Sequence, residues 1–186
     1  MKLLGIQKVY EGKVLKNYEI KYLNKKNVEK SFEIVSKKDL TNLSDLGKKP
    51  SGVSIFATCN DKMLLLKEFR IGAGKEIYNL CAGTLEEGES IEECINRELY
   101  EETGLKIKQV KKLLPPSFAA VAISDVTTYI ALVEVEGRIE DHTSDNEQIR
   151  AALYSRDEVA TLIDAGEPFS SRAQVLAYLF SQGMTI

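Results

Sequence analysis

Apolar residues alternate with polar ones, or cluster, in three segments at the start of the chain, and this pattern predicts β-strands. The segments are residues 4–14, 15–23 and 28–35, with polar turns at residues 11–13 and 24–27. Consecutive strands joined by short turns form a β-meander. Three strands without a covering helix bury little apolar surface, so we expect the meander to pack on the next domain or on a second subunit.

The rest of the chain alternates strand-like and helical patterns after a polar connector, residues 36–51. We expect an N-terminal β region of residues 1–50, then a larger α/β domain of residues 51–186. Its mixed sheet would be interrupted by one helix and closed by two more. The predicted strands of this domain are residues 53–58, 63–69, 77–81, 107–114, 126–135 and 148–155, the predicted helices are residues 90–103, 157–165 and 171–182, and a loop is predicted at 115–125.

Composition and charge limit the class of protein. A chain of 186 residues that is 44% hydrophobic and 28% charged can bury a core, and its net charge of −3 gives no general attraction to nucleic acid or to an acidic membrane. The three cysteines, Cys59, Cys81 and Cys94, lack the spacing of a disulfide framework or a zinc site, so we expect them to be small buried residues. Without a membrane-spanning run or a signal-peptide pattern, we expect a soluble, cytoplasmic protein.

The predicted helix at residues 90–103 has clear start and stop signals. Ser90 and Glu93, three residues apart, form a capping box, and Gly104 stands where the helix would end. Apolar residues at helical spacing would turn one face of this helix toward the core. These residues are Ile91, Cys94, Ile95 and Leu99.

Three carboxylates lie on the same helix at spacings of three and four residues: Glu98, Glu101 and Glu102. Like charges at these spacings repel, and negative side chains are disfavoured near the carboxyl end of a helix. A solvated acidic face is the common explanation of a Glu-rich helix. Here a broken local rule favours a functional site, and hard cations such as Mg²⁺ or Mn²⁺ prefer carboxylate oxygens.

The stretch around this helix resembles a known motif. Residues 83–105 have the spacing G-x5-E-x7-R-E-L-x-E-E-x-G-L, which resembles the Nudix box at every defined position. Residues 51–90, residues 144–150 and the closing helix are similar to the ADP-ribose pyrophosphatase branch of the Nudix family. The resemblance implies an α/β/α sandwich with a mixed sheet and metal-dependent hydrolysis of a pyrophosphate bond.

The resemblance also implies roles for individual residues. Those in the box and nearby would bind metal, hold the box together or bind substrate, and an acidic residue late in the chain would be the general base. The implied metal ligands are the Ala82 carbonyl, Glu98 and Glu102, with Glu101 a ligand or a residue that positions the attacking water; Glu89 and Arg97 would pair structurally; Glu147, or else Asp145, would be the base; and Arg70, Gly83, Ser124 and Asp125 would bind substrate.

Some positions depart from the pattern of that branch. Ala120 stands where a proline is usual, Cys81 replaces another common proline, and Asn79 stands where glutamate is frequent. Pocket walls set specificity, so the substrate stays open. ADP-ribose, cleaved to AMP and ribose 5-phosphate, is the first expectation. The alternatives are another sugar nucleotide, a dinucleoside polyphosphate, or a non-catalytic sensor that binds ADP-ribose; the family also implies a homodimer formed through the N-terminal meander.

Overall fold

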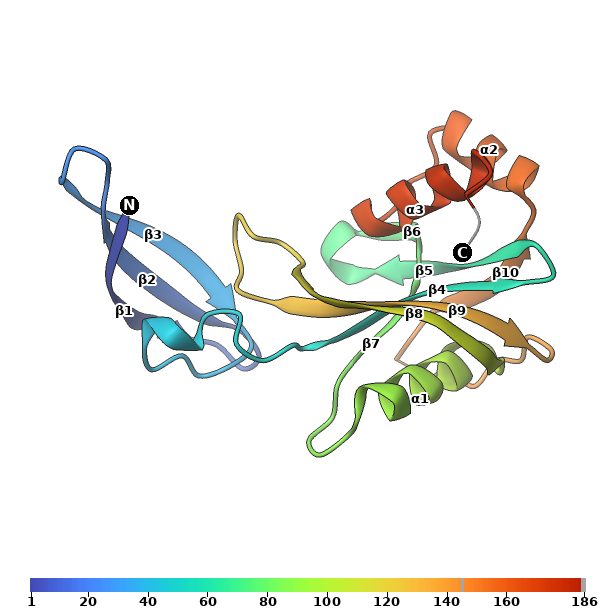
Figure 1. The fold of residues 1–186 in the computed structure, drawn as a ribbon, viewed down its shortest axis with the longest axis horizontal. Helices are drawn as coiled ribbons and strands as arrows, with labels where there is room; N and C mark the ends of the chain where they lie inside the picture. The colour runs from blue at the N-terminus through green and yellow to red at the C-terminus, as the bar shows by residue number, and fades with distance from the viewer. Residues whose placement is uncertain (145, 185–186) are drawn as a thin grey trace. The chain divides into compact units, whose positions relative to one another are not determined.

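The computed structural model describes residues 1–144 and 146–184 (Figure 1). The chain forms two compact units. One unit consists of residues 1–51 with residues 116–128, and the other consists of residues 52–115 with the residues from 129 onward. No helix in the described part of the chain is long and apolar enough to cross a membrane.

The first unit is built on an antiparallel sheet in the order β1-β2-β3, which is the expected meander. The first strand ends earlier than predicted, because the chain turns where the Gly12 N–H donates to the Leu15 carbonyl at 2.9 Å. Residues 116–128 join this unit through the Val35 N–H, which donates to the Ile123 carbonyl at 2.8 Å. The strands are β1 (Lys2–Glu11), β2 (Lys16–Leu23) and β3 (Glu29–Ser36), followed by the short 3-10 helix η1 (Leu43–Asp45).

The second unit contains a mixed sheet in the order β10-β5-β4-β9-β8, with β6 paired to β5 and β7 paired to β4. Strands β4 and β9 are parallel, whereas β5 is antiparallel to β4, β6 and β10. The strands are β4 (Gly52–Cys59), β5 (Lys62–Arg70), β6 (Lys75–Asn79), β7 (Cys81–Thr84), β8 (Lys106–Phe118), β9 (Thr127–Glu136) and β10 (Ile149–Tyr154), with the 3-10 helix η2 (Ile71–Ala73) after β5.

Helices cover both faces of this sheet: α1 (Ile91–Thr103) lies on one face, and α2 (Arg156–Asp164) and α3 (Ser171–Ser181) lie on the other (Figure 1). Alternate residues of β4 point to the two layers, since Ile55 belongs to the core beneath α1 and Phe56 to the core beneath α2 and α3. The second unit is therefore the α/β/α sandwich that the resemblance implied.

The expected end of one strand is wrong. The sequence predicted a loop from Pro115, but β8 continues through Pro115 and Pro116 to Phe118. Because β8 is the last strand in the sheet order, its prolines need no partner on the outer side. The expected burial of the cysteines holds for Cys81 and Cys94, whereas Cys59 is only half-buried.

Candidate active site

The local signals at the ends of α1 act as predicted. The Glu93 N–H donates to the Ser90 hydroxyl oxygen at 3.2 Å, and the Ser90 N–H donates to the Glu93 carboxylate at 2.8 Å. Gly104 ends the helix with a left-handed φ of 71°. A side chain at that position would also meet the backbone N of Glu140 at 2.9 Å, so the helix ends against the loop that leads toward β10.

Glu98 lies directly against the backbone of β7. Pairing of Val53 with Gly83 fixes β7 beside β4. A Cβ added to Gly83 would lie 1.6 Å from the Glu98 carboxyl carbon, so only glycine leaves space for this carboxylate. Burial raises the pKa of Glu98 above its ordinary value, against the opposing effect of Arg97.

Glu102, one turn further along α1, is the more deeply buried of the two carboxylates. Burial raises its pKa to about 8, although hydrogen bonds from Cys81 and from the Ala82 N–H oppose the shift. The Ala82 N–H donates to the Glu102 Oε2 at 3.1 Å. Burial also raises the pKa of the Cys81 thiol well above its ordinary value, so this thiol is a protonated, unreactive group.

Arg97 joins the acidic loop to the helix. Its Nε and Nη2 donate to the two oxygens of Glu89 at 2.7 and 2.9 Å, which is the pair implied by the box. Its Nη1 donates to Glu98 at 2.8 Å and to Glu101 at 3.2 Å. Arg97 therefore offsets the repulsion among three of the box carboxylates, and the half-exposed Glu101 lies with this network.

A cavity of about 330 Å³ in the second unit brings four of the predicted residues together. Arg70 comes from the end of β5, Ala82 from β7, Glu102 from α1 and Glu147 from the segment before β10. Glu98 lies against Gly83, the residue after Ala82. The other lining residues are Glu68, Phe69, Ile71, Gly72, Asn146, Gln148 and Ile149.

Glu147, the expected base, is held by its own turn. The Ser144 hydroxyl donates to the Glu147 Oε2 at 3.0 Å, and the Glu147 N–H donates to the Ser144 carbonyl at 3.0 Å. Glu147 lines the cavity together with Glu102. The alternative base, Asp145, lies outside the residues that the structure describes.

Two predicted substrate-binding residues, Ser124 and Asp125, belong to the first unit. The Ser124 hydroxyl oxygen accepts a hydrogen bond from the Val126 N–H at 3.2 Å, which stabilises a local turn. Asp125 is buried; its Oδ2 accepts from the Gly47 N–H at 3.4 Å, and its Oδ1 accepts no hydrogen bond from the described residues. Their role in substrate binding stays a prediction.

The oxygens of this site suit a hard divalent cation. Glu98 and Glu102 are poorly solvated carboxylates one helical turn apart, and a cation would stabilise both. The described residues contain no closed group of three or more His, Cys, Asp or Glu side chains. An open set of two carboxylates and one carbonyl leaves positions for water and phosphate oxygens, as Mg²⁺ requires.

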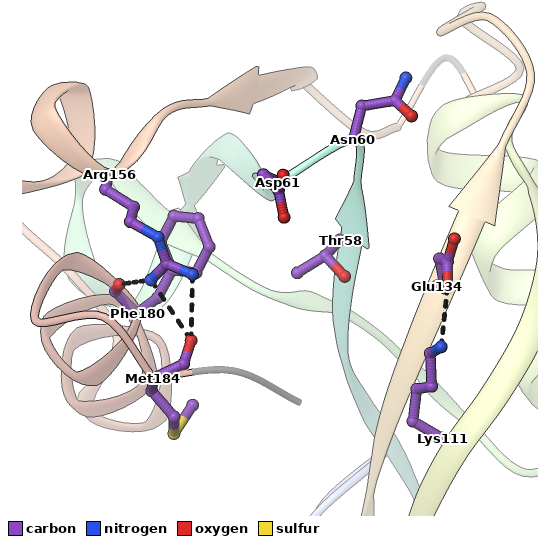
Figure 2. A pocket seen from close by; sticks show the side chains of 8 residues that line it. All are labelled: Thr58, Asn60, Asp61, Lys111, Glu134, Arg156, Phe180 and Met184. Carbon is purple, nitrogen blue, oxygen red and sulfur yellow. Dashed lines mark hydrogen bonds and ion pairs between the residues drawn. The ribbon is translucent and has the colours of Figure 1, made fainter.

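A second cavity, of about 350 Å³, shares no lining residue with the first, and three of its charged residues, Lys111, Glu134 and Arg156, are engaged in contacts. Figure 2 shows that Arg156 donates to the Phe180 and Met184 carbonyls, and that Lys111 pairs with Glu134 at 2.8 Å. The Arg156 guanidinium also stacks 4.4 Å from the centre of the Phe180 ring. These contacts anchor the end of α3 and the edge of the sheet, and the box carboxylates are absent from the lining.

Glu68 is a site residue that the sequence pattern did not indicate. Its side chain is buried in the cavity wall, where its Oε1 accepts from the Arg70 Nε at 2.6 Å and from the Asn79 Nδ2 at 2.6 Å. The alternation of side chains along the strand could have indicated it. Glu68 lies on the same face of the strand as Leu64 and Leu66, which belong to the core beneath α1. A charged residue at a core-facing position needs a partner.

Comparisons with known proteins agree with this geometry. The sequence profile described as NUDIX domain matches residues 48–175. The ADP-ribose pyrophosphatase of Bacillus subtilis (strain 168) is 24% identical over 182 residues, covering 96% of this chain and 91% of that protein. The ADP-ribose pyrophosphatase of Escherichia coli (strain K12) is 30% identical over 137 residues, covering 68% and 64% respectively.

Two further similarities extend the comparison. The ADP-sugar pyrophosphatase of Mus musculus is 27% identical over 168 residues, covering 84% of this chain and 74% of that protein. A solved structure titled "Crystal structure of ADP compounds hydrolase" has a TM-score of 0.73 at 17% identity and covers 100% of this chain and 98% of that one, which shows a shared fold. With the profile matching well over half of its length, the chain belongs to the Nudix family and is a Nudix hydrolase similar to ADP-ribose pyrophosphatases.

Proposed function

We propose that this Nudix hydrolase is a cytoplasmic, divalent-metal-dependent enzyme that hydrolyses the pyrophosphate bond of a nucleoside diphosphate sugar, with ADP-ribose as its first substrate. The products would be AMP and ribose 5-phosphate. The observation that carries the proposal is the cavity that joins Arg70, Ala82, Glu102 and Glu147, beside the contact of Glu98 with Gly83.

The functional groups of the site would each have a chemical task in such a reaction. Glu98, Glu102 and the Ala82 carbonyl would hold Mg²⁺ or Mn²⁺, which when bound neutralises phosphoryl oxygens and makes water a better nucleophile. Glu147 would accept the proton of the attacking water. Arg70, whose side chain is half-exposed at the cavity, would bind an anionic group of the substrate through its guanidinium.

A substrate panel tests the proposal. ADP-ribose, other sugar nucleotides and dinucleoside polyphosphates would each be incubated with Mg²⁺, with Mn²⁺ and with a chelator, and released phosphate esters would be measured. We expect cleavage of ADP-ribose above the others, abolished by the chelator. Faster cleavage of another substrate would reassign the pocket, and ligand-dependent stabilisation without any cleavage would favour the sensor.

A homodimer formed through the N-terminal sheet is part of the proposal. The buried Ile20 of β2 lies opposite Phe32 of β3, and Phe32 is 45% exposed. Leu3, near the end of the same sheet, is 48% exposed. Large apolar side chains gathered on one small sheet favour a partner surface.

The mass of the protein in solution tests the dimer. Light scattering should give a mass of twice 20.8 kDa. Phe32→Glu should lower this mass, whereas Glu33→Gln, one residue along on the other face of β3, should not.

A further inference from the structure

The buried Glu68 connects the cavity to the start of helix α3. Along β5, Glu68 and Arg70 are two residues apart and therefore share a face. On the neighbouring β6, Asn79 lies opposite Leu66 and so diagonal to Glu68. The Glu68 Oε1 accepts from both Arg70 and Asn79 at 2.6 Å. The Glu68 Oε1 thus links Arg70 at the cavity to Asn79 on β6.

Asn79 is also fixed by a contact with the residue before α3. Its Oδ1 accepts a hydrogen bond from the Ser170 hydroxyl at 2.5 Å, and the Ser170 N–H donates to the Tyr78 carbonyl at 2.9 Å. Ser170 is the residue that caps α3, where its hydroxyl oxygen accepts from the Ala173 N–H. The side-chain amide of Asn79 therefore has both ends occupied, and its orientation toward Glu68 is fixed by regular structure on two sides.

This arrangement determines how Arg70 meets the cavity. The contact with Glu68 uses Nε, so the two terminal nitrogens on the other edge of the guanidinium are directed away from that bond. Among residues 1–144 and 146–184, Glu68 is the one ion-pair partner of Arg70. Paired N–H groups on a fixed guanidinium suit bidentate binding of phosphate or carboxylate oxygens. The contact with Glu68 therefore matters more for the orientation of the Arg70 guanidinium than for the net charge of the cavity.

We propose that Glu68 and Asn79 are positioning residues, which orient Arg70 for the anionic group of the substrate and thereby set substrate affinity. This inference rests on the proposed function, because it assigns the ligand of Arg70 in that reaction. Neither residue belongs to the Nudix box, and neither need touch the substrate. The chemical requirement is one acceptor and one donor facing each other at positions 68 and 79.

An isosteric exchange of the two groups tests this requirement. Asn79→Asp removes the donor and places two carboxylates together, so we expect KM to rise about tenfold with kcat within about twofold. Adding Glu68→Gln supplies an amide nitrogen that donates to the carboxylate introduced at position 79. Because one oxygen accepts both bonds in the wild-type protein, the amide must rotate about its terminal bond so that its oxygen accepts from the Arg70 Nε. The double variant should return KM to within about twofold of the wild-type value. A purely structural role would not make KM follow this exchange while kcat stays constant.

A second cycle asks whether the effect passes through Arg70. Arg70→Ala should raise KM, and Asn79→Asp added to it should raise KM no further, since the two changes remove the same interaction. Additive effects, an unchanged KM in Asn79→Asp, or a fall in kcat instead of a rise in KM would each overturn the inference. If Asn79→Asp does not fold, Asn79→Ala removes the donor without adding a charge and takes its place.

Failure of the proposed function would be seen separately. If the wild-type protein cleaves nothing in the panel, affinity for ADP-ribose would be measured by calorimetry without metal for the wild-type protein, Asn79→Asp and the double variant. Weaker binding by Asn79→Asp with recovery in the double variant would support the positioning role. Equal affinities would overturn it. If the wild-type enzyme is active and the exchange has no effect, only the positioning role fails.

Discussion

The carboxylate of Glu98 occupies the space that a side chain at Gly83 would need, with 1.6 Å between a Cβ at position 83 and the Glu98 carboxyl carbon. The first glycine of the box is thus explained by a contact between strand and helix. A second close approach lies beside it, because a Cβ on Gly52 would come within 1.9 Å of the Gly83 carbonyl oxygen. A Cβ at Gly83 would meet a side chain, whereas a Cβ at Gly52 would meet backbone, so substitutions at the two positions should differ in their effects on activity and stability.

Gly83→Ala should remove activity while leaving the fold largely intact. The clash is with the far end of a side chain, so Glu98 can rotate away, but its carboxylate is then lost from the site. We expect turnover to fall at least about 100-fold and the free energy of unfolding to fall by about 1 kcal/mol or less. Turnover and urea unfolding would be measured together.

Gly52→Ala is the matched comparison, because its clash is with backbone that is paired in the sheet. We expect it to lower the free energy of unfolding by about 1–3 kcal/mol. Gly5→Ala, whose Cβ would meet nothing within 4 Å, should change neither quantity. Full activity in Gly83→Ala would show that the position of Glu98 at β7 is not needed for the reaction.

Glu98→Gln and Glu102→Gln should each keep the fold and lose most activity. Each change removes a proposed metal ligand, and a loss of several kcal/mol in transition-state stabilisation corresponds to about 100-fold or more in turnover. Each also removes a poorly solvated negative charge, so the melting temperature in chelator should be unchanged or higher. Stabilisation of the wild-type protein by Mn²⁺, measured by melting temperature, should be reduced in both variants. Wild-type turnover in either variant would remove that residue from the site.

Local rules predicted much of this site from the sequence. The Ser90 and Glu93 capping box and the Gly104 stop depend on residues close in the chain, where spacing determines geometry. The pairing of Arg97 with Glu89 was implied by the resemblance to the box. Continuous apolar runs likewise located β4 and β5, because both faces of these strands are buried.

The remaining features depend on which strands become neighbours. The buried contact of Glu68 with Asn79 requires β6 to pair with β5 in one register, and no local pattern states that register. In the same way, the continuation of β8 through Pro115 follows from its place at the edge of the sheet. Sequence spacing alone therefore predicted helix α1 but not the contact of Glu68 with Asn79 in the cavity wall.

Glu147→Gln should lower turnover with only a modest change in KM if Glu147 is the general base. Loss of a general base lowers turnover by about 100-fold to 10,000-fold. Ser144→Ala is the control, because it removes the hydroxyl bonded to Glu147 at 3.0 Å and leaves the carboxylate in place. We expect Ser144→Ala to retain most activity. If Asp145→Asn abolishes turnover and Glu147→Gln does not, the base is Asp145.

The ion pairs of Glu134 should make part of the stability of the protein sensitive to acid. Hydrogen bonds from Lys108 at 2.5 Å and from Lys111 lower the pKa of Glu134 from an ordinary value of 4.5 to about 2. A lowered carboxyl pKa means that the folded state binds protons less readily than the unfolded state. The contribution of Glu134 is therefore complete above pH 4.5 and is lost as the pH falls toward about 2.

Glu134→Gln should accordingly unfold at lower urea concentration than the wild-type protein near neutral pH, and the difference should shrink as the pH falls below 4.5. Glu136→Gln, on the same strand, is the control, since Glu136 has no ion pair among the described residues. Because these side chains are partly exposed, added salt should also reduce the difference for Glu134→Gln. A difference that stays constant across pH and salt would show that Glu134 stabilises the sheet edge by packing and not by its charge.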